Sequence, residues 1–129
     1  MTVVHLFVYG TLRPGDVRWP ILAPYVAGDG VADAVTGRVY DTGRGYPAAR
    51  FDEVGTIVGR TYELRRDRLA EGLAVLDQEE SSVEGGYRRV VVTTTSETRA
   101  WAYEYGGGLE LAPIESGDWL RRGASAPGL

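Results

Sequence analysis

The segment Thr2–Tyr9 (TVVHLFVY), followed by Gly10–Gly15 (GTLRPG), sets how this chain begins to fold. The first eight of these residues are rich in β-branched and aromatic side chains, which predicts a β-strand. Glycine and proline then end the strand abruptly. Because a strand that stops at a sharp turn leaves backbone N–H groups without ladder partners, this turn can hold a carboxylate or phosphate. Gly10 would allow a ligand close to the backbone, and an ordinary tight turn is the alternative.

Short strands separated by turns are expected along most of the remaining chain. The composition of each segment predicts extended structure at 31–40, 46–51, 55–64, 87–95 and 98–105, the last two forming a hairpin over Ser96-Glu97. Gly59 marks a bulge or a close approach within its strand. A short helix at 19–25, a turn at 41–45 and a last helical turn within 114–121 complete the expected elements. Short strands without alternating βαβ units predict a small closed or curled sheet with one packed helix.

Residues 67–80 have the clearest helical pattern of the chain, and Asp67 is the expected N-cap. At 100° per residue, Leu69, Leu73 and Leu76 lie on one face of this helix. The leucine stripe therefore predicts which side of the helix packs against the core.

Glu80 falls in the middle of the same leucine stripe, close to the end of the expected helix. A carboxyl group turned toward apolar surroundings has a raised pKa, and such a glutamate can both accept and donate a proton. Glu80 is therefore a candidate general acid and base. The alternative is that Glu80 lies beyond the last turn, solvated or paired with an arginine such as Arg88 or Arg89.

The composition excludes several classes of chemistry. The chain of 129 residues has no cysteine, which excludes disulfides, thiolate catalysis and cysteine-ligated metal centres. His5 is the single histidine, which excludes a site with several histidine ligands, and no metal is expected. All fourteen positive charges are arginines, which excludes lysine mechanisms. A net charge of −4 disfavours nucleic acid as a partner.

The length predicts one domain, at 1–122, with a flexible C-terminal tail at 123–129. The N-terminus lacks the pattern of a signal peptide, and no apolar run reaches the ~20 residues that a membrane helix needs. We expect a cytoplasmic protein with a small-molecule partner, no membrane partner and, by default, a monomeric state.

Five segments in order resemble the gamma-glutamylcyclotransferase-like superfamily, also called AIG2-like. Each segment alone is a weak signal, but their order across about residues 3–119 makes the resemblance specific. The segments are Val8–Gly15 (VYGTLRPG), Gly45–Ala48 (GYPA), Val58–Leu64 (VGRTYEL), Leu76–Glu80 (LDQEE) with Tyr87-Arg88-Arg89, and Ile114–Trp119 (IESGDW).

The resemblance implies an α+β fold, a small mixed β-barrel flanked by a few helices. It also implies a lyase-like transferase that cyclises a γ-glutamyl group to 5-oxoproline and frees an amine, without a cofactor. The family's catalytic glutamate falls on Glu80, in agreement with the helical pattern. Its substrate-cradling loop falls on four consecutive residues, Tyr9, Gly10, Thr11 and Leu12.

Two positions of the family pattern allow more than one interpretation in this chain. Glu79 is also acidic, so the assignment to Glu80 depends on the Leu-Asp-x-x-Glu spacing. The family tyrosine falls on Tyr87, which either hydrogen-bonds near Glu80 or packs as a core residue. Arg89 is expected to reach a carboxylate, either structural or on the substrate.

Function classes other than catalysis are also open at this point. A non-catalytic member of the same fold would keep the cradle and bind a small carboxylate without turnover. A protein-interaction or nucleic-acid-binding barrel is the third class, and the acidic balance disfavours nucleic acid.

Overall fold

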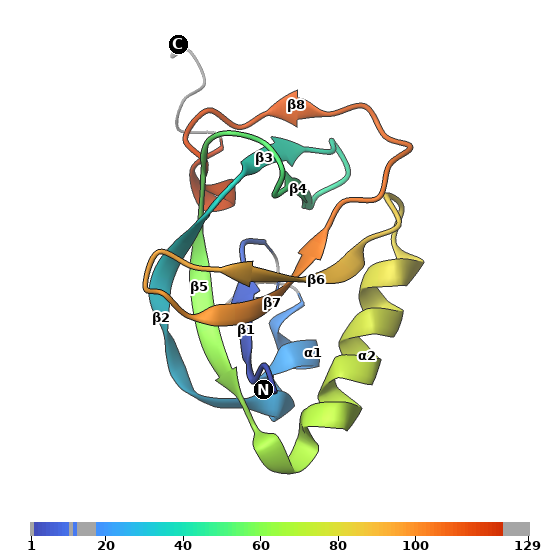
Figure 1. The fold of residues 1–129 in the computed structure, drawn as a ribbon. Helices are drawn as coiled ribbons and strands as arrows, with labels where there is room; N and C mark the ends of the chain where they lie inside the picture. Colours follow the sequence, from blue (N-terminus) through green and yellow to red (C-terminus); the bar gives the residue numbers. More distant parts are fainter. Residues whose placement is uncertain (1, 11, 13–17, 123–129) are drawn as a thin grey trace.

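The computed structural model describes residues 2–10, 12 and 18–122, and the elements lie in two sheets with one long helix (Figure 1). The strands are β1 (His5–Val8), β2 (Val26–Thr36), β3 (Arg38–Asp41), β4 (Pro47–Arg50), β5 (Thr56–Leu64), β6 (Arg88–Thr93), β7 (Arg99–Glu104) and β8 (Ala112–Pro113). The α-helices are α1 (Trp19–Leu22) and α2 (Leu69–Ser82), and the 3-10 turns are η1 (Ala23–Tyr25), η2 (Arg66–Arg68) and η3 (Trp119–Arg121).

The larger sheet has the strand order β2-β5-β1-β7-β6, and the smaller has the order β4-β3-β8. Strand β1 pairs antiparallel with β5 and parallel with β7, so the larger sheet is mixed. The expected α+β class with a mixed sheet is therefore confirmed, although the two sheets do not close into one continuous barrel. Figure 1 shows α2 running beside the larger sheet.

Strand β1 is the central strand, and it is buried on both faces. Leu6 and Val8 point into the cluster that packs around Leu76 of α2. Phe7 alternates with them and packs in a second cluster on the opposite side. Because successive side chains of a strand point to opposite faces, the nearly continuous apolar run follows from this double burial. The end of β1, where the Gly10 turn begins, is thereby fixed in the interior.

The expected strand at 31–40 is in fact two strands that lie in different sheets. Residues Val26–Thr36 form β2, and Arg38–Asp41 form β3. Gly37, between them, has φ of 150°, a conformation that L side chains rarely adopt, and a Cβ there would lie 2.8 Å from the Arg50 carbonyl oxygen. The chain changes sheets at this glycine.

The helix expected at 67–80 is present as α2, but it begins at Leu69. Helix α2 follows the 3-10 turn η2, and its N-cap is Arg68, without a side-chain cap. The prediction of Asp67 as N-cap is wrong, because its carboxylate accepts two hydrogen bonds from Arg65, at 3.2 and 2.8 Å. The helix extends to Ser82, which keeps Glu80 within its last turn.

Other expected elements are present with small changes. The predicted hairpin is present, and its strands β6 and β7 pair antiparallel with the register Arg88↔Glu104 to Thr93↔Arg99. The short helix at 19–25 is α1 followed by η1, and the last helical turn is η3. Strand β8 was not expected. The predicted tail at 123–129 lies outside the described residues. Within the described ranges, no helix has both the length and the apolar character needed to cross a membrane.

Candidate functional site

A cavity of about 40 Å³, partly open to solvent, lies between the end of β1, the start of β4 and the last turn of α2. Its described walls combine apolar and aromatic side chains with one acid and one arginine. The lining residues are Phe7, Val8, Tyr9, Gly10, Leu12, Arg18, Tyr46, Pro47, Glu80, Tyr87 and Tyr103. A small apolar cavity with a few convergent polar groups is the usual form of a ligand site.

Glu80 lies in this cavity and is almost completely buried, with 6 % of its surface exposed. Its position follows from the helix geometry, since Gly72, Leu76 and Glu80 are the buried residues of α2 and lie four apart. The neighbouring Glu79 is half-exposed by comparison, with 38 % of its side chain accessible. Of these two consecutive acids, Glu80 is the one that a ligand in the cavity would meet.

Burial raises the pKa of Glu80, and the positive charge and hydrogen bond of Arg18 oppose that rise without cancelling it. The charge of Glu79 acts in the same direction as burial. A carboxyl group with a raised pKa exchanges protons closer to neutral pH than an exposed glutamate does. The environment therefore suits Glu80 to accepting and donating a proton.

Arg18 is the partner of Glu80, and no sequence pattern predicted this pair. Its Nη2 donates a hydrogen bond of 3.0 Å to Glu80 Oε1. Arg18 directly precedes α1, and Glu80 is in the last turn of α2. The pair therefore joins two helices through residues 62 positions apart in the chain. The sequence-based alternative, a pair with Arg88 or Arg89, names the wrong arginines, because these bind Glu104 and Asp77.

The turn after β1 provides the opposite wall of the cavity. Within the described part of the chain, the backbone N–H groups of Gly10 and Leu12 donate to no acceptor. A Cβ at Gly10 would lie 2.8 Å from Pro47 Cγ, so glycine permits the close approach of this turn to β4. Thr11, which is also expected in the cradle, lies outside the described residues.

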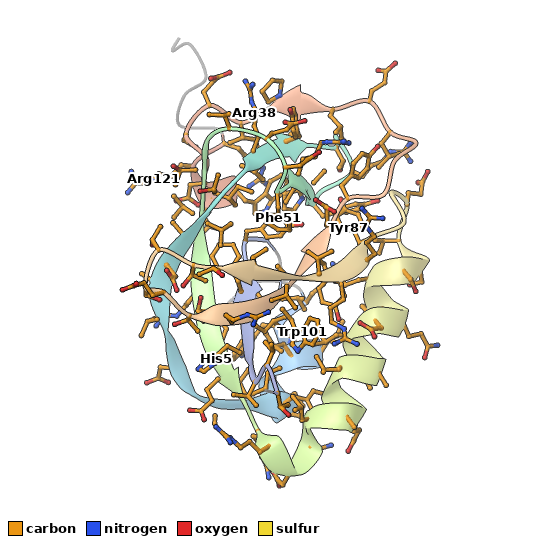
Figure 2. All side chains as sticks on the ribbon, viewed as in Figure 1. His5, Arg38, Phe51, Tyr87, Trp101 and Arg121 are labelled. Carbon is orange, nitrogen blue, oxygen red and sulfur yellow. The ribbon has the colours of Figure 1, made fainter. Side chains whose placement is uncertain are left out.

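Tyr9 and Tyr87 line the cavity, but their hydroxyl groups bind the protein itself. The Tyr9 hydroxyl donates to the carbonyl oxygen of Tyr103, and that of Tyr87 donates to the carbonyl oxygen of Pro47 at 2.6 Å. Burial raises the pKa of both phenols, so both remain neutral. Figure 2 shows Tyr87 near the C-terminal end of α2. Tyr87 is therefore a wall of the cavity and a member of the core.

Tyr46 and Tyr87 line the cavity next to β4 and belong to a cluster of three aromatic residues. The ring of Tyr87 makes edge contacts with Tyr46 and with Tyr105, at centroid distances of 6.1 and 6.0 Å. The Tyr46 hydroxyl donates to the carbonyl oxygen of Glu84. Tyr46, Pro47 and Tyr103 also line the cavity and were not predicted from the sequence, although Tyr46-Pro47 belongs to one of the family segments.

The remaining polar residues near α2 bind one another. Arg89 donates two hydrogen bonds to the carboxylate of Asp77, at 2.9 and 3.1 Å, which confirms the structural version of the expectation for Arg89. The Arg89 guanidinium also lies over the Trp101 ring, 4.2 Å from its centroid. Among the described residues, no group of three or more His, Asp or Glu side chains could hold a metal ion.

The chain is similar to known proteins in sequence and in fold. Residues 6–121 match the family described as gamma-glutamyl cyclotransferase, AIG2-like. A relative from Halalkalibacterium halodurans, named "Putative gamma-glutamylcyclotransferase", is 34 % identical over 89 residues, covering 67 % of this chain and 80 % of that protein.

Solved structures show the same fold. The protein ytfP of Escherichia coli is 32 % identical with a TM-score of 0.58, and the alignment covers 92 % of this chain and 97 % of that one. An AIG2-like protein of Mus musculus is 17 % identical with a TM-score of 0.63, covering 81 % and 78 %. At this identity the second likeness concerns the fold alone.

Proposed function

Because the chain belongs to the gamma-glutamyl cyclotransferase, AIG2-like family, we propose that it releases 5-oxoproline and a free amine from a γ-glutamyl amine, with Glu80 as general acid and base. The observation that carries this proposal is the burial of Glu80 in a cavity whose other wall is the turn at Gly10. The site thus has one proton-transfer group facing backbone donors.

The proposed reaction needs little from the protein, because the substrate brings its own nucleophile. The α-amine of the γ-glutamyl group attacks the γ-carbonyl carbon, a C–N bond forms, and the amide bond to the leaving amine breaks. Holding the substrate folded makes this step intramolecular, which lowers the entropic part of the barrier.

Glu80 has two tasks in this scheme. The carboxylate first accepts a proton from the α-ammonium group, which leaves the amine free to attack. The same carboxyl group then donates this proton to the departing nitrogen, so it is ionised again at the end of the cycle. The second proton that the attacking nitrogen loses as the lactam forms passes to the released amine, which leaves as an ammonium ion. A carboxyl group whose pKa is raised by burial is suited to both steps.

The backbone N–H groups of Gly10 and Leu12 would bind the α-carboxylate of the substrate or the oxyanion that develops on the γ-carbonyl. Tyr9 and Tyr87 would contribute surface to the substrate site rather than hydroxyl donors, since both hydroxyls already bind carbonyl oxygens. Thr11 is proposed as part of the same cradle from the family resemblance alone.

The test is a mass-spectrometric assay for 5-oxoproline with glutathione, γ-glutamyl-α-amino acids and γ-glutamyl-ε-lysine as substrates. We expect release with the wild type and at least a thousandfold loss in Glu80→Gln, which keeps the shape but cannot transfer a proton. Glu79→Gln is the matched control, because it removes the adjacent half-exposed acid and should retain most activity.

Two results would contradict the proposal. A fully active Glu80→Gln protein would remove Glu80 from the mechanism. An inactive wild type that binds 5-oxoproline saturably would instead support a carboxylate-binding protein without turnover, in which the Arg18–Glu80 pair keeps the acid occupied.

A further inference from the structure

Nearly all arginines in the described part of the chain have a partner within the protein. All but two bind a carboxylate or a backbone carbonyl oxygen. The exceptions are Arg66 and Arg99, whose guanidinium groups make no hydrogen bond, ion pair or ring contact with any described residue. Two unpaired arginines are unexpected in this chain, because its 18 acidic residues outnumber its 14 arginines.

Both unpaired arginines line one groove, although Arg66 is in η2 and Arg99 begins β7. The groove is open to solvent and has a volume of about 620 Å³. Its other lining residues are Thr2, Val3, Val4, His5, Glu97 and Thr98. Since η2 precedes α2 and Glu80 is in the last turn of α2, the groove is distinct from the cavity of the proposed function.

The walls of this groove are joined by hydrogen bonds of the N-terminal segment. The Val4 carbonyl oxygen accepts from the Leu64 N–H at 2.7 Å, which fixes the segment to the end of β5, just before η2. The Val3 carbonyl oxygen accepts from Trp101 Nε1 at 3.1 Å, which fixes it to β7. Figure 1 shows the N-terminus at the end of the fold where β5 leads into α2, and Figure 2 shows His5 beside it. The segments that carry the two arginines are therefore held on either side of the start of β1.

Positive charge exceeds negative charge in the groove. Glu97 is its one described acid, and it forms no ion pair with either arginine. Two guanidinium groups thus face one carboxylate, in a protein whose net charge is −4. A concave surface lined by an excess of one charge raises the local concentration of the opposite ion.

We propose that this groove binds the phosphate group of a small soluble phosphate monoester, with Arg66 and Arg99 as its principal ligands. The planar guanidinium offers N–H donors in a geometry that matches phosphate oxygens. A phosphate dianion balances two arginines and has enough acceptors for both. The Thr98 hydroxyl and the His5 ring supply further donors at the same groove. This site is independent of the proposed function.

The charge distribution favours a small ligand over a macromolecular one. Nucleic acids and anionic membranes bind through many basic residues that together neutralise many phosphates. Here the unpaired cations of the described chain are two arginines in one groove, and the net negative charge repels an extended anionic surface. A single phosphate group is the ligand that matches this number of cations.

Isothermal titration calorimetry of the full chain, at low salt and pH 8, tests the proposal with four probes. Inorganic phosphate and glycerol 3-phosphate carry the proposed group, glycerol is the uncharged counterpart, and acetate is a singly charged anion. We expect saturable binding of both phosphates with Kd of about 1 mM or below, at least about tenfold tighter than acetate, and no binding of glycerol.

Two substitutions test whether the arginines form the site. Arg66→Gln and Arg99→Gln should each weaken binding of glycerol 3-phosphate at least about tenfold, the effect of losing charge-assisted hydrogen bonds. Both side chains are exposed and unpaired, so the Tm of the free protein should stay the same. Arg65→Gln is the matched control, because Arg65 is the exposed neighbour of Arg66 and is paired with Asp67. It should change the affinity by less than about twofold.

Four results would overturn the proposal. These are no saturable binding of either phosphate, equal affinity for acetate and glycerol 3-phosphate, and undiminished binding in both Arg66→Gln and Arg99→Gln, which would place the anion elsewhere, for example near Arg18. The fourth is sedimentation with phosphatidic acid vesicles but not with phosphatidylcholine vesicles, without binding of glycerol 3-phosphate, which would identify a membrane as the source of the phosphate. None of these results depends on the release of 5-oxoproline, so the two proposals fail separately.

Discussion

The Tyr103 hydroxyl donates a hydrogen bond of 2.7 Å to Asp77 Oδ1, and Asp77 lies one helical turn before Glu80. Arg89 holds the same carboxylate through two further hydrogen bonds. Tyr103 is in β7 and Arg89 in β6, so both strands of the hairpin bind α2 at one point. The position of Glu80 relative to the larger sheet therefore depends on contacts to Asp77.

Tyr103→Phe should lower the free energy of unfolding by about 1–2 kcal/mol, because it removes one hydrogen bond to a charged group and keeps the ring. Urea denaturation at neutral pH measures this change. Tyr46→Phe is the control, since its hydroxyl binds a neutral carbonyl at the surface, and a smaller loss is expected. If the free energy of unfolding falls equally in the two variants, the hydrogen bond to the charged Asp77 stabilises the protein no more than a bond to a neutral carbonyl does.

A second prediction concerns Asp33, a buried carboxylate that has no arginine partner in the described chain. It accepts hydrogen bonds from the Thr61 and Thr95 hydroxyls and from both the backbone and the hydroxyl of Ser96. Burial alone would raise its pKa, but hydrogen bonds from Ser96, the Ala34 N–H and Thr61 outweigh burial and lower the pKa to about 2. These bonds join β2 and β5 to the turn between β6 and β7.

A lowered pKa in the folded state means that the ionised form of Asp33 stabilises the protein. This contribution is present above the pKa of an unfolded aspartate, near 4, and is lost as pH falls toward about 2. Asp33→Asn should lower the free energy of unfolding at pH 7 by up to about 2 kcal/mol and flatten its dependence between pH 4 and 2. Urea unfolding across this pH range measures both effects.

Asp67→Asn is the matched control for Asp33→Asn. The pKa of Asp67 is also lowered, by a hydrogen bond from Arg65, but the carboxylate is exposed to solvent. Exposed ion pairs contribute little to stability, so the pH dependence should barely change. If Asp33→Asn leaves the free energy of unfolding with the same pH dependence between pH 4 and 2, the prediction is contradicted. The hydrogen bonds at position 33 would then be equally strong with a neutral amide.

Gly59→Ala should be among the most damaging single-methyl substitutions in the described chain. A Cβ at Gly59 would lie 2.2 Å from the Val8 carbonyl oxygen and 2.6 Å from Phe7 Cζ. The backbone of β1 must move to relieve this contact, at a cost of at least about 2–3 kcal/mol. Because Val8 precedes the Gly10 turn, catalytic efficiency should fall together with Tm in thermal melts and 5-oxoproline assays.

Gly43→Ala is the matched control for Gly59→Ala, because it replaces a glycine at a position where a Cβ meets no other atom. Gly43 has φ of 74° and no atom within 4 Å of a Cβ, so its replacement costs about 1–2 kcal/mol of backbone strain and leaves the cavity unchanged. A Gly59→Ala protein as stable as Gly43→Ala would contradict the close approach of β1 and β5.

Local patterns in the sequence predicted the parts of the fold that local physics determines. The leucine stripe of α2 gave the burial of Glu80, since helix periodicity extends to the last turn. The β6–β7 hairpin followed from two β-rich segments and a short connection. The close approach at Gly59 was one of two alternatives that a glycine inside a strand allows.

The local sequence patterns could not predict contacts between segments that are distant in the chain. Arg18 meets Glu80 across 62 residues, and nothing in the local sequence around either residue specifies the other. Aspartate is a residue type that often caps a helix, but the carboxylate of Asp67 is bound by Arg65. A 3-10 turn at Arg66–Arg68 also shifts the start of α2 to a later residue. At Gly37 a change of sheet interrupts what the composition presents as one strand.

The last prediction is that Glu80→Gln is more stable than the wild type while being inactive. Burial raises the pKa of Glu80 despite Arg18, so the folded protein disfavours the ionised form. The resulting penalty is fully present above the folded pKa and disappears as pH falls through it toward the unfolded value. Thermal melts from pH 4 to 8 should therefore give Glu80→Gln the higher Tm at pH 8, with a difference that shrinks on acidification. A lower Tm for Glu80→Gln at every pH would show that the bond from Arg18 outweighs burial.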